Sequence, residues 1–283
     1  MSFILGVDTG GTYTDAVILE DEERVISFSK SLTTHSDLSL GIGSAIQKAI
    51  GQKNIEPKKI SLVSLSTTLA TNALVEGQGD RVALVMIGFK ESDLEKHSIF
   101  DALKGDPFLV LSGGHNYAGL EKSPLDKNDL ENWISEVKGA SAYAVCSQFA
   151  VRNPEHELEA AKIIRKLTDK PVSLSHQLSA KLNGPKRALT AVLNARLIAL
   201  IDLLIIKAEH VIKDLGIQAP LMVVRGDGAL ISAAQAREKP IETILSGPAA
   251  SIVGARWLTD ESEAIVSDIG GTTTDIAVLT GGK

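Results

Sequence analysis

An eight-residue pattern occurs twice in the chain, once near each end. Residues 8–15 read DTGGTYTD and residues 268–275 read DIGGTTTD, so both follow the pattern D-x-G-G-T-x-T-D. At a usage of about 7% for each residue type, six fixed positions match a random window on the order of once in 10⁷. Chance is a poor explanation for the second copy. We therefore interpret the two segments as one structural motif used twice.

Each copy is predicted to form the turn of a β-hairpin. Apolar runs at residues 3–7 and 16–19 flank the first copy, and runs at 264–266 and 276–279 flank the second. Apolar runs joined by a short Gly-rich segment are typical of hairpins. The sequence thus predicts two hairpins of the same construction, offset by 268 − 8 = 260 residues.

The residue types in these turns favour binding of a phosphate group. Adjacent glycines permit a positive φ and let backbone N–H groups approach an anion without an intervening Cβ, and threonine hydroxyls add neutral donors. The alternative is that both are simply tight Gly-rich hairpins, which two matching copies make the weaker interpretation. The candidate phosphate-binding residues are Gly10, Gly11, Thr12, Thr14, Gly270, Gly271 and Thr272.

Each pattern begins with an aspartate, Asp8 or Asp268. A carboxylate repels a phosphate group, so direct binding is not its role. We expect either a divalent cation, Mg²⁺ with its waters, between the two groups, or an aspartate that orients an attacking water or hydroxyl. Two such hairpins facing each other would hold a triphosphate from both sides.

Composition excludes several classes of protein. The chain of 283 residues is 44% hydrophobic and 23% charged, which is a globular balance, and its net charge of −6 includes no basic block for nucleic acid. Its one cysteine, Cys146, closes no internal disulfide and builds no zinc-thiolate cluster. The most apolar run, residues 197–206, contains Asp202 and is shorter than the ~20 residues of a membrane span. We predict a cytoplasmic protein without a membrane segment, in which this run is a core helix.

Patterning along the chain predicts an α/β fold with an insertion. A helix capped by Ser36 or Asp37 should run through Ile50, and the segment from about residue 88 to 184 has shorter elements that we interpret as an inserted α/β subdomain. Within it, Asn153 should cap a helix that has Pro154 at its first position. The other predicted elements are strands at 24–29, 60–65, 81–87, 142–146 and 221–224 and helices from 153 to about 168 and from about 186 to 213.

Five polar residues are weaker candidates for a ligand site. Thr67, Thr68 and Asn72 follow a predicted strand, where open α/β sheets place ligand contacts, although capping of a helix explains the threonines nearly as well. Asp227 between two glycines could reach a metal or substrate, or could stabilise its turn. Ser246 begins a predicted helix, whose N–H groups could meet an anion or be capped in the ordinary way.

The remaining reactive side chains favour structural roles. Cys146 on a predicted strand is expected in the core, and His156 and His176 at the surface or as caps, because their spacing matches no metal motif. Glutamates 155, 157 and 159 are interpreted as a solvated helix start, where negative charge is favourable.

These residues carry a family resemblance. The paired hairpins resemble the two phosphate-binding motifs of the superfamily of actin, hexokinase and heat-shock chaperone ATPases. Further segments are similar to the hydantoinase A/5-oxoprolinase family, which includes acetone carboxylase β-type chains. These segments are STTLATNAL at 66–74, AVC at 144–146, NPEHE at 153–157, Ser175-His176, NARL at 194–197, RGDG at 225–228 and LSGPAA at 245–250.

The resemblance implies a fold and a division of the chain. The expected fold is α/β: a ribonuclease H-like (actin-like ATPase) lobe with an inserted α/β subdomain. Residues 1–185 would form the N-terminal-type region, with core strands in 1–87 and the insertion in 88–185. Residues 186–283 would begin the core region and complete the first lobe to about 258. The hairpin at 259–283 would then open a second lobe.

Only 283 − 275 = 8 residues follow Asp275, whereas a matching lobe needs on the order of 150. We therefore expect a truncated or naturally split protein in which the second lobe is only begun and which is inactive alone. Its exposed strand edge should pair with itself, with another chain or with the missing lobe.

The resemblance also implies an activity. Family members use ATP and Mg²⁺ to open a cyclic amide or imide ring, such as a hydantoin or 5-oxoproline, by phosphorylating the amide oxygen, and work with a hydantoinase B-type subunit. Asp8 would hold Mg²⁺ through water and Asp268 would orient the nucleophile or also hold the metal; the two roles could be exchanged. The alternatives are an ATP-dependent carboxylase subunit, a small-molecule kinase of the same superfamily, or a non-catalytic assembly module.

Overall fold

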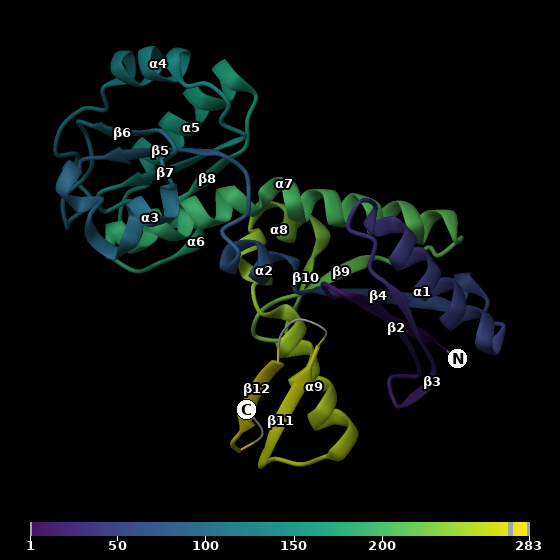
Figure 1. The fold of residues 1–283 in the computed structure, drawn as a ribbon. Helices are drawn as coiled ribbons and strands as arrows, with labels where there is room; N and C mark the ends of the chain where they lie inside the picture. Colours follow the sequence, from purple (N-terminus) through teal and green to yellow (C-terminus); the bar gives the residue numbers. More distant parts are fainter. Residues whose placement is uncertain (1, 271–273, 282–283) are drawn as a thin grey trace. The chain divides into compact units, whose positions relative to one another are not determined.

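The computed structural model describes residues 2–270 and 274–281 (Figure 1). The chain forms two compact units, described here one at a time. The first unit combines Met1–Gly77 with Leu200–Lys283, and the second consists of Gln78–Ala199. Gly271 and Thr272, which the sequence suggests as phosphate ligands, lie outside the described residues.

The first unit is built on a six-stranded mixed sheet with strand order β10-β9-β4-β1-β2-β3. Strands β1, β2 and β3 are antiparallel neighbours, whereas β4 runs parallel to β1, and β9 runs parallel to β4. The predicted first hairpin therefore lies inside a larger sheet. The strands are β1 (Phe3–Thr9), β2 (Tyr13–Glu20), β3 (Arg24–Leu32), β4 (Ile60–Thr67), β9 (Leu221–Val224) and β10 (Leu230–Ser232).

Helix α1 (Leu38–Lys53) covers one face of this hairpin. The Asp37 side chain accepts a hydrogen bond from the N–H of Ser39, which confirms the predicted start of the helix. Ser27 and Ser29 of β3 donate to carbonyls of α1, each over 2.5 Å. The helix thus packs through apolar side chains while serines satisfy polar groups at its border with the sheet.

The second predicted hairpin is also present, as a separate two-stranded sheet in the first unit. It consists of β11 (Ala264–Ile269) and β12 (Thr274–Leu279), which pair in antiparallel register. Helix α9 (Ser246–Thr259) contacts both strands. The other helices of the unit are α2 (Leu69–Val75) and α8 (Ala233–Glu238), with 3₁₀ turns at Pro57–Lys59 and Pro240–Thr243.

The second unit is a four-stranded parallel sheet with strand order β6-β5-β7-β8. Helices pack their apolar sides on both of its faces: α4 (Lys127–Glu136) and α5 (Glu155–Thr168) on one, α3 (Ile99–Leu103) and the start of α7 (Gly184–Asp214) on the other. Its strands are β5 (Val82–Ile87), β6 (Phe108–Leu111), β7 (Ala142–Ser147) and β8 (Val172–Leu174). It also contains α6 (Ser175–Leu178) and 3₁₀ turns at Glu91–Asp93 and Lys96–Ser98.

The boundary of this unit differs from the predicted insertion. We expected the strand at 81–87 among the core strands, but β5 pairs with β6 and β7 in the second sheet. All six of its residues are buried, which is the pattern of a strand covered on both faces by helices. A run of apolar residues alone does not reveal which sheet a strand joins.

Helix α7 (Gly184–Asp214) belongs to the second unit in its first half and to the first unit in its second half. It confirms the helix predicted at about 186–213. It is long and apolar enough to cross a membrane, a test that a buried core helix also passes, and half of its most apolar window is buried within the protein. Ala188, Ala191 and Val192 pack in the core of the second unit, and Ile201 and Ile205 are also buried.

Two side chains at the start of α5 were expected in solvent but are buried. His156 is 3% exposed and Glu157 is completely buried. Glu157 accepts hydrogen bonds from the backbone N–H of Ser147 and from the hydroxyl of Ser175, so its burial is compensated by donors. The predicted capping by Asn153 occurs as a bond from the N–H of Glu155, although the helix starts one residue later than expected.

Candidate functional site

The register of the two hairpins brings the aspartates of each motif together. Asp8 lies directly opposite Asp15, and Asp268 lies directly opposite Asp275. Like charges in directly opposed positions destabilise a sheet. In the first hairpin Lys30 Nζ, 3.3 Å from Asp15 Oδ1, offsets part of this repulsion, and both pairs favour a cation placed beside them.

Asp8 is a carboxyl group with a perturbed pKa. Burial raises its pKa, and the nearby carboxylates of Asp15 and Asp268 raise it further, while a hydrogen bond from Ser66 acts in the opposite direction. The Ser66 hydroxyl donates to Asp8 Oδ1 over 2.6 Å. The carboxylate of Asp268, in the second hairpin, is among the charges that raise the pKa of Asp8.

The start of α9 is fixed to the end of β4, close to Asp8. The Ser246 hydroxyl donates to the Thr67 carbonyl and accepts from the Thr67 N–H, over 2.9 and 3.2 Å. The next residue, Gly247, lies so close that an added Cβ would be 3.0 Å from Thr68 Cγ2 and 3.8 Å from Asp8 Oδ1. The absence of a side chain at Gly247 thus lets the first turn of the helix approach the carboxylate.

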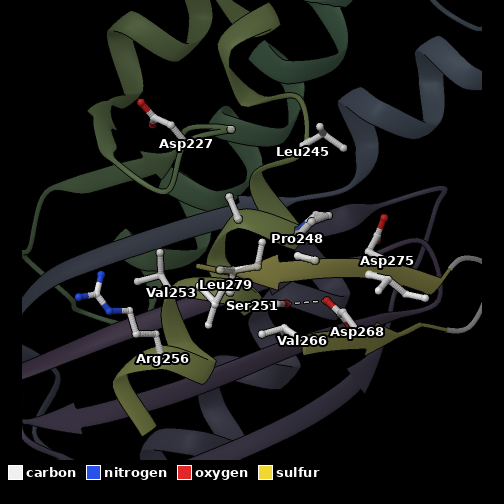
Figure 2. A pocket seen from close by; sticks show the side chains of 15 residues that line it. Asp227, Leu245, Pro248, Ser251, Val253, Arg256, Val266, Asp268, Asp275 and Leu279 are labelled. Atoms are coloured by element: carbon white, nitrogen blue, oxygen red, sulfur yellow. Dashed lines mark hydrogen bonds between the residues drawn. The ribbon is translucent and has the colours of Figure 1, made fainter. Parts of the chain in front are cut away.

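One turn further along, α9 holds the second hairpin. The Ser251 hydroxyl donates to Asp268 Oδ2 over 2.5 Å, the dashed bond in Figure 2. The first aspartate of each motif therefore accepts a hydrogen bond from a serine: Asp8 from Ser66 and Asp268 from Ser251. Both carboxylates lie beside the same helix. A cavity of about 640 Å³ borders α9, the inner face of the hairpin and the turn at Asp227 (Figure 2).

Threonines on the buried face of the sheet support the turn of the first hairpin. Thr14 is buried, and its hydroxyl shares a hydrogen bond with that of Thr33, which in turn donates to the Gly10 carbonyl. Thr14 therefore lies on the opposite face from Asp8 and supports the turn. Gly10 does not use the positive φ that the sequence allows; an added Cβ there would instead lie 3.1 Å from the Tyr13 carbonyl. The turn needs glycine at this position for space.

Some of the weaker candidates have structural roles, and others lie next to the site. The Thr67 hydroxyl donates to the Thr9 carbonyl and accepts from the Leu69 N–H, which is a structural use. Thr68 lies beside Gly247, and Asn72 reaches back toward the Thr68 hydroxyl. The Asp227 carboxylate binds Arg225, which lowers the pKa of Asp227 to about 2, and accepts from the Ala229 N–H. It stabilises its own turn while bordering the cavity.

The site has the donors that Mg²⁺ requires. Mg²⁺ binds one or two carboxylates and keeps several waters, so it needs no cluster of protein ligands. The described residues contain no group of three or more histidine, cysteine or carboxylate side chains suited to a metal. Asp8 and Asp268 supply hard oxygen donors in a region of concentrated negative charge, which fits this cation.

Three residues of the site were not identified from the sequence. Asp15 and Asp275 were nevertheless visible in the repeat itself, because a hairpin centred on the motif pairs its first aspartate with its last. Ser251 carried no such signal, since its role depends on the contact of α9 with the second hairpin. Ser66, by contrast, belongs to the polar segment that the sequence places at the end of a strand.

The first unit thus holds paired acidic hairpins in an α/β protein, and sequence comparison places it in a family. Residues 4–168 match the hydantoinase/oxoprolinase N-terminal region, and residues 187–283 match the hydantoinase/oxoprolinase domain. The chain belongs to the hydantoinase/oxoprolinase family, which confirms the resemblance seen in its motifs.

Three relatives show the range of the family. The chain is 28% identical to the caprolactamase subunit alpha of Pseudomonas jessenii over 304 residues, covering 99% of this chain and 44% of that protein. It is 26% identical to the acetophenone carboxylase gamma subunit of Aromatoleum aromaticum, covering 97% and 42%. It is 28% identical to 5-oxoprolinase 1 of Arabidopsis thaliana, covering 96% and 25%. The chain spans less than half the length of each of these relatives.

Two solved structures share the fold. The ATP-dependent caprolactamase of Pseudomonas jessenii, 28% identical, superposes with a TM-score of 0.78 over 97% of this chain and 43% of that one. A nucleotide-free acetone carboxylase, 20% identical, superposes with a TM-score of 0.84 over 99% and 44%. The mixed α/β architecture is therefore that of these enzymes.

Proposed function

We propose that this chain is part of an ATP-dependent enzyme that opens a cyclic amide or imide ring, such as a lactam, a hydantoin or 5-oxoproline. One observation carries the proposal: Gly247, which lies beside Asp8, and Ser251, which bonds Asp268, are four residues apart on α9, so the first aspartates of both motifs lie along the first turns of one helix. Two hairpins that contact the same helix can bind the same polyphosphate. Relatives named as a caprolactamase and a 5-oxoprolinase support the reaction class.

The strand order of the first unit supports a ribonuclease H-like lobe. Three antiparallel strands, β3-β2-β1, continue into β4 and β9, which run parallel to β1. In this proposal the four-stranded unit is the inserted subdomain, and β11–β12 opens a second lobe. The relatives' greater length supplies the residues that such a lobe needs.

Each group has a proposed role. The Gly10 N–H donates to the Tyr13 carbonyl over 2.9 Å, so Gly10 contributes to the phosphate site by shaping the turn. The backbone N–H groups of Gly11 and Thr12 bind the β- and γ-phosphates, with Thr14 supporting the turn from the buried face. Gly270, Gly271 and Thr272 bind from the other side. Asp8 holds Mg²⁺ through water, and Asp268 orients the nucleophile or also holds the metal. The cation, when bound, neutralises charge on the phosphates.

The chemistry explains why ATP is used on an amide. An amide carbonyl is a weak electrophile, and transfer of the γ-phosphoryl group of ATP to its oxygen makes the carbonyl carbon open to attack by water. The resulting tetrahedral adduct expels the ring nitrogen as an amine, which breaks the C–N bond and opens the ring. Hydrolysis of the remaining acyl phosphate gives the carboxylate and phosphate. The protein contributes mainly positioning and charge neutralisation. The serine bonds to Asp8 and Asp268 keep one oxygen of each carboxylate occupied and so fix the direction of the other.

The decisive experiment measures ATP hydrolysis in the complete protein, assembled with a hydantoinase B-type subunit. Asp8→Asn and Asp268→Asn should each reduce turnover about 100-fold or more, because each removes a charge from the reaction centre. Asp260→Asn is the matched control: it makes the same change at an exposed C-cap of α9 in the left-handed region, which Asn tolerates. Undiminished turnover in both site variants contradicts the proposal.

A substrate panel separates the alternatives. ATP use stimulated by 5-oxoproline, hydantoins or lactams identifies the ring-opening enzyme. Stimulation by acetone with bicarbonate identifies a carboxylase subunit, a possibility that the acetophenone carboxylase relative favours, and stimulation by polyols a kinase. Lack of ATP hydrolysis under all conditions would favour a non-catalytic assembly module.

Assembly and location are part of the proposal. Two relatives are named as subunits, which supports a multi-subunit enzyme, and we propose a B-type partner. The exposed hairpin also supports pairing of two copies of this chain. A cytoplasmic location fits the single buried thiol, Cys146, whose pKa burial and the neighbouring Glu157 raise to about 12.

A further inference from the structure

The four-stranded sheet of the second unit has the topology of a doubly wound ligand-binding sheet. From β5 the chain passes through α3 to β6 on one side, and from β7 it passes through α5 to β8 on the other. The point between β5 and β7 is thus the place where the winding changes direction. In open α/β sheets, ligands bind outside the carboxyl ends of the strands at this point.

Three loops converge at this end of the sheet. The N–H of Gln148, just after β7, donates to the Ile87 carbonyl at the end of β5 over 2.9 Å. The N–H of His115, in the loop after β6, donates to the Gln148 carbonyl over 3.1 Å. Gly88 and Gly114 adopt positive φ, and a Cβ on either would lie within 3.1 Å of a neighbouring loop. The backbones therefore approach as closely as glycine permits.

Buried polar atoms without a partner gather in these same residues. His115 is 1% exposed, and neither of its ring nitrogens has a hydrogen-bond partner. The hydroxyl of Ser147, the last residue of β7, and the Oε1 atom of Gln148 are also buried and unpartnered. A buried polar group without a partner costs about 1–3 kcal/mol, so a cluster of them points to a bound group.

The neighbouring charged groups, by contrast, are already paired. His156 Nδ1 accepts from the Gly114 N–H over 2.9 Å, so a neutral His156 carries its proton on Nε2, 3.0 Å from Glu121 Oε1. Glu157 accepts from Ser147, Ser175 and His176. The ring of His115 lies 4.5 Å from that of His156, and burial lowers the pKa of His115. The negative charges that act on His115 come from the carboxylates of Glu155 and Glu121, which disfavour an anion. The described residues also offer no group of three side chains that could hold a metal.

We propose that the carboxyl end of the second unit's sheet, between β5 and β7, binds a small neutral amide through His115, Ser147 and Gln148. Gln148 Oε1 accepts a hydrogen bond, and the neutral ring of His115 and the Ser147 hydroxyl can each donate one. An amide donates its N–H to Gln148 Oε1 and accepts at its C=O from Ser147 and from the protonated ring nitrogen of His115, all without a charge. The second ring nitrogen of His115 is not used by this ligand. The site involves no residue of the first unit, so the proposal stands apart from the proposed function.

The test follows the imidazole ¹⁵N signals of His115 by NMR in the 283-residue chain, without nucleotide. His115→Gln assigns the signals, with His35→Gln as the control for an exposed histidine. 2-Pyrrolidone, a small lactam, should shift the His115 signals saturably. Cyclopentanone, of the same size but without the N–H, should bind about tenfold more weakly, the cost of one hydrogen bond. Phosphate should produce no saturable shift.

Substitutions at other residues of the site test the proposal even if His115→Gln prevents the chain from folding. Gln148→Met removes the acceptor and should weaken 2-pyrrolidone binding about tenfold, with a similar loss for Ser147→Ala. Gln177→Met, the same change at an exposed position of α6, should bind as the wild type does. The proposal is overturned by any of three results: no saturable shift with 2-pyrrolidone, which would mean that water alone satisfies these atoms; equal binding of cyclopentanone or phosphate; or unchanged binding by both site variants.

Discussion

Helices α1 and α9 cover opposite faces of the two motif hairpins. In the first hairpin, α1 packs on the face of Leu5 and Ile18, and the carboxylates of Asp8 and Asp15 occupy the more open face. In the second hairpin, α9 packs on the carboxylate face and bonds to Asp268. The outer face there exposes apolar side chains, namely Ile265, Ile269, Ile276 and Val278.

This difference separates what the motif determines from what its surroundings determine. The same eight residues produce the same register and the same opposed aspartates in both places. The neighbouring strands β3 and β4 and helix α1 exist only around the first copy, so only that copy is buried on the face away from the carboxylates. Equivalent positions of the two hairpins, 260 residues apart, therefore carry similar residue types but differ in how much their burial contributes to stability.

The largest expected effect is on the free energy of unfolding, at a pair of equivalent positions in the two hairpins. Leu5 is completely buried and Ile265 is 74% exposed. Leu5→Ala should lower the free energy of unfolding by about 2–5 kcal/mol, because it leaves a cavity in the core. Ile265→Ala should change it by less than about 0.5 kcal/mol. Urea denaturation followed by circular dichroism measures both, and similar losses in the two variants would show that the outer face of the second hairpin is covered in solution.

A second prediction concerns the buried carboxyl of Asp8. Its pKa is raised in the folded protein by burial and by Asp15 and Asp268. The ionised group therefore destabilises the fold above its folded pKa, and this cost disappears below the pKa of the unfolded chain, where both states are protonated. Asp8→Asn should raise the free energy of unfolding at pH 7 by about 1 kcal/mol, the size usual for such stabilising changes, while abolishing the proposed activity.

The control for this prediction has the opposite sign. The pKa of Asp227 is lowered to about 2 by Arg225, so its charge stabilises the fold above the unfolded pKa and this contribution is lost as the pH falls toward 2. Asp227→Asn should therefore slightly reduce stability at pH 7. Thermal unfolding between pH 3 and pH 7 should show the Asp8→Asn gain shrinking toward acid; a gain that is constant with pH would contradict the electrostatic explanation.

The smallest expected effect concerns association. The four exposed apolar side chains of the second hairpin form a contiguous stripe on alternate positions of β11 and β12. Exposed apolar patches favour association, so Ile276→Lys should shift the chain toward monomer in sedimentation velocity experiments. Leu167→Lys changes an exposed apolar residue of the second unit and should leave association unaltered. Equal behaviour of the two variants would place any self-association elsewhere.

Part of the fold could be predicted from local patterns. Both hairpins, the capped helix α1 and the strand at 221–224 followed from apolar periodicity and capping residues, because these signals are contained in a few neighbouring residues. The assignment of β5 and the burial of His156 and Glu157 could not be predicted in this way. They depend on partners 10 to 60 residues away in the chain, such as Ala142 of β7 for Val82 of β5 and Gly114 for His156.

By itself, the sequence determined the repeated motif, its register and the family, because these depend on residue types at fixed short spacings. The tertiary structure decided which face of each hairpin is covered, brought Ser66 to Asp8 and Ser251 to Asp268, and left His115 buried without a partner. The reason is physical. Hydrogen bonds and burial are set by distances between atoms, and the residues concerned come from segments that only folding brings together.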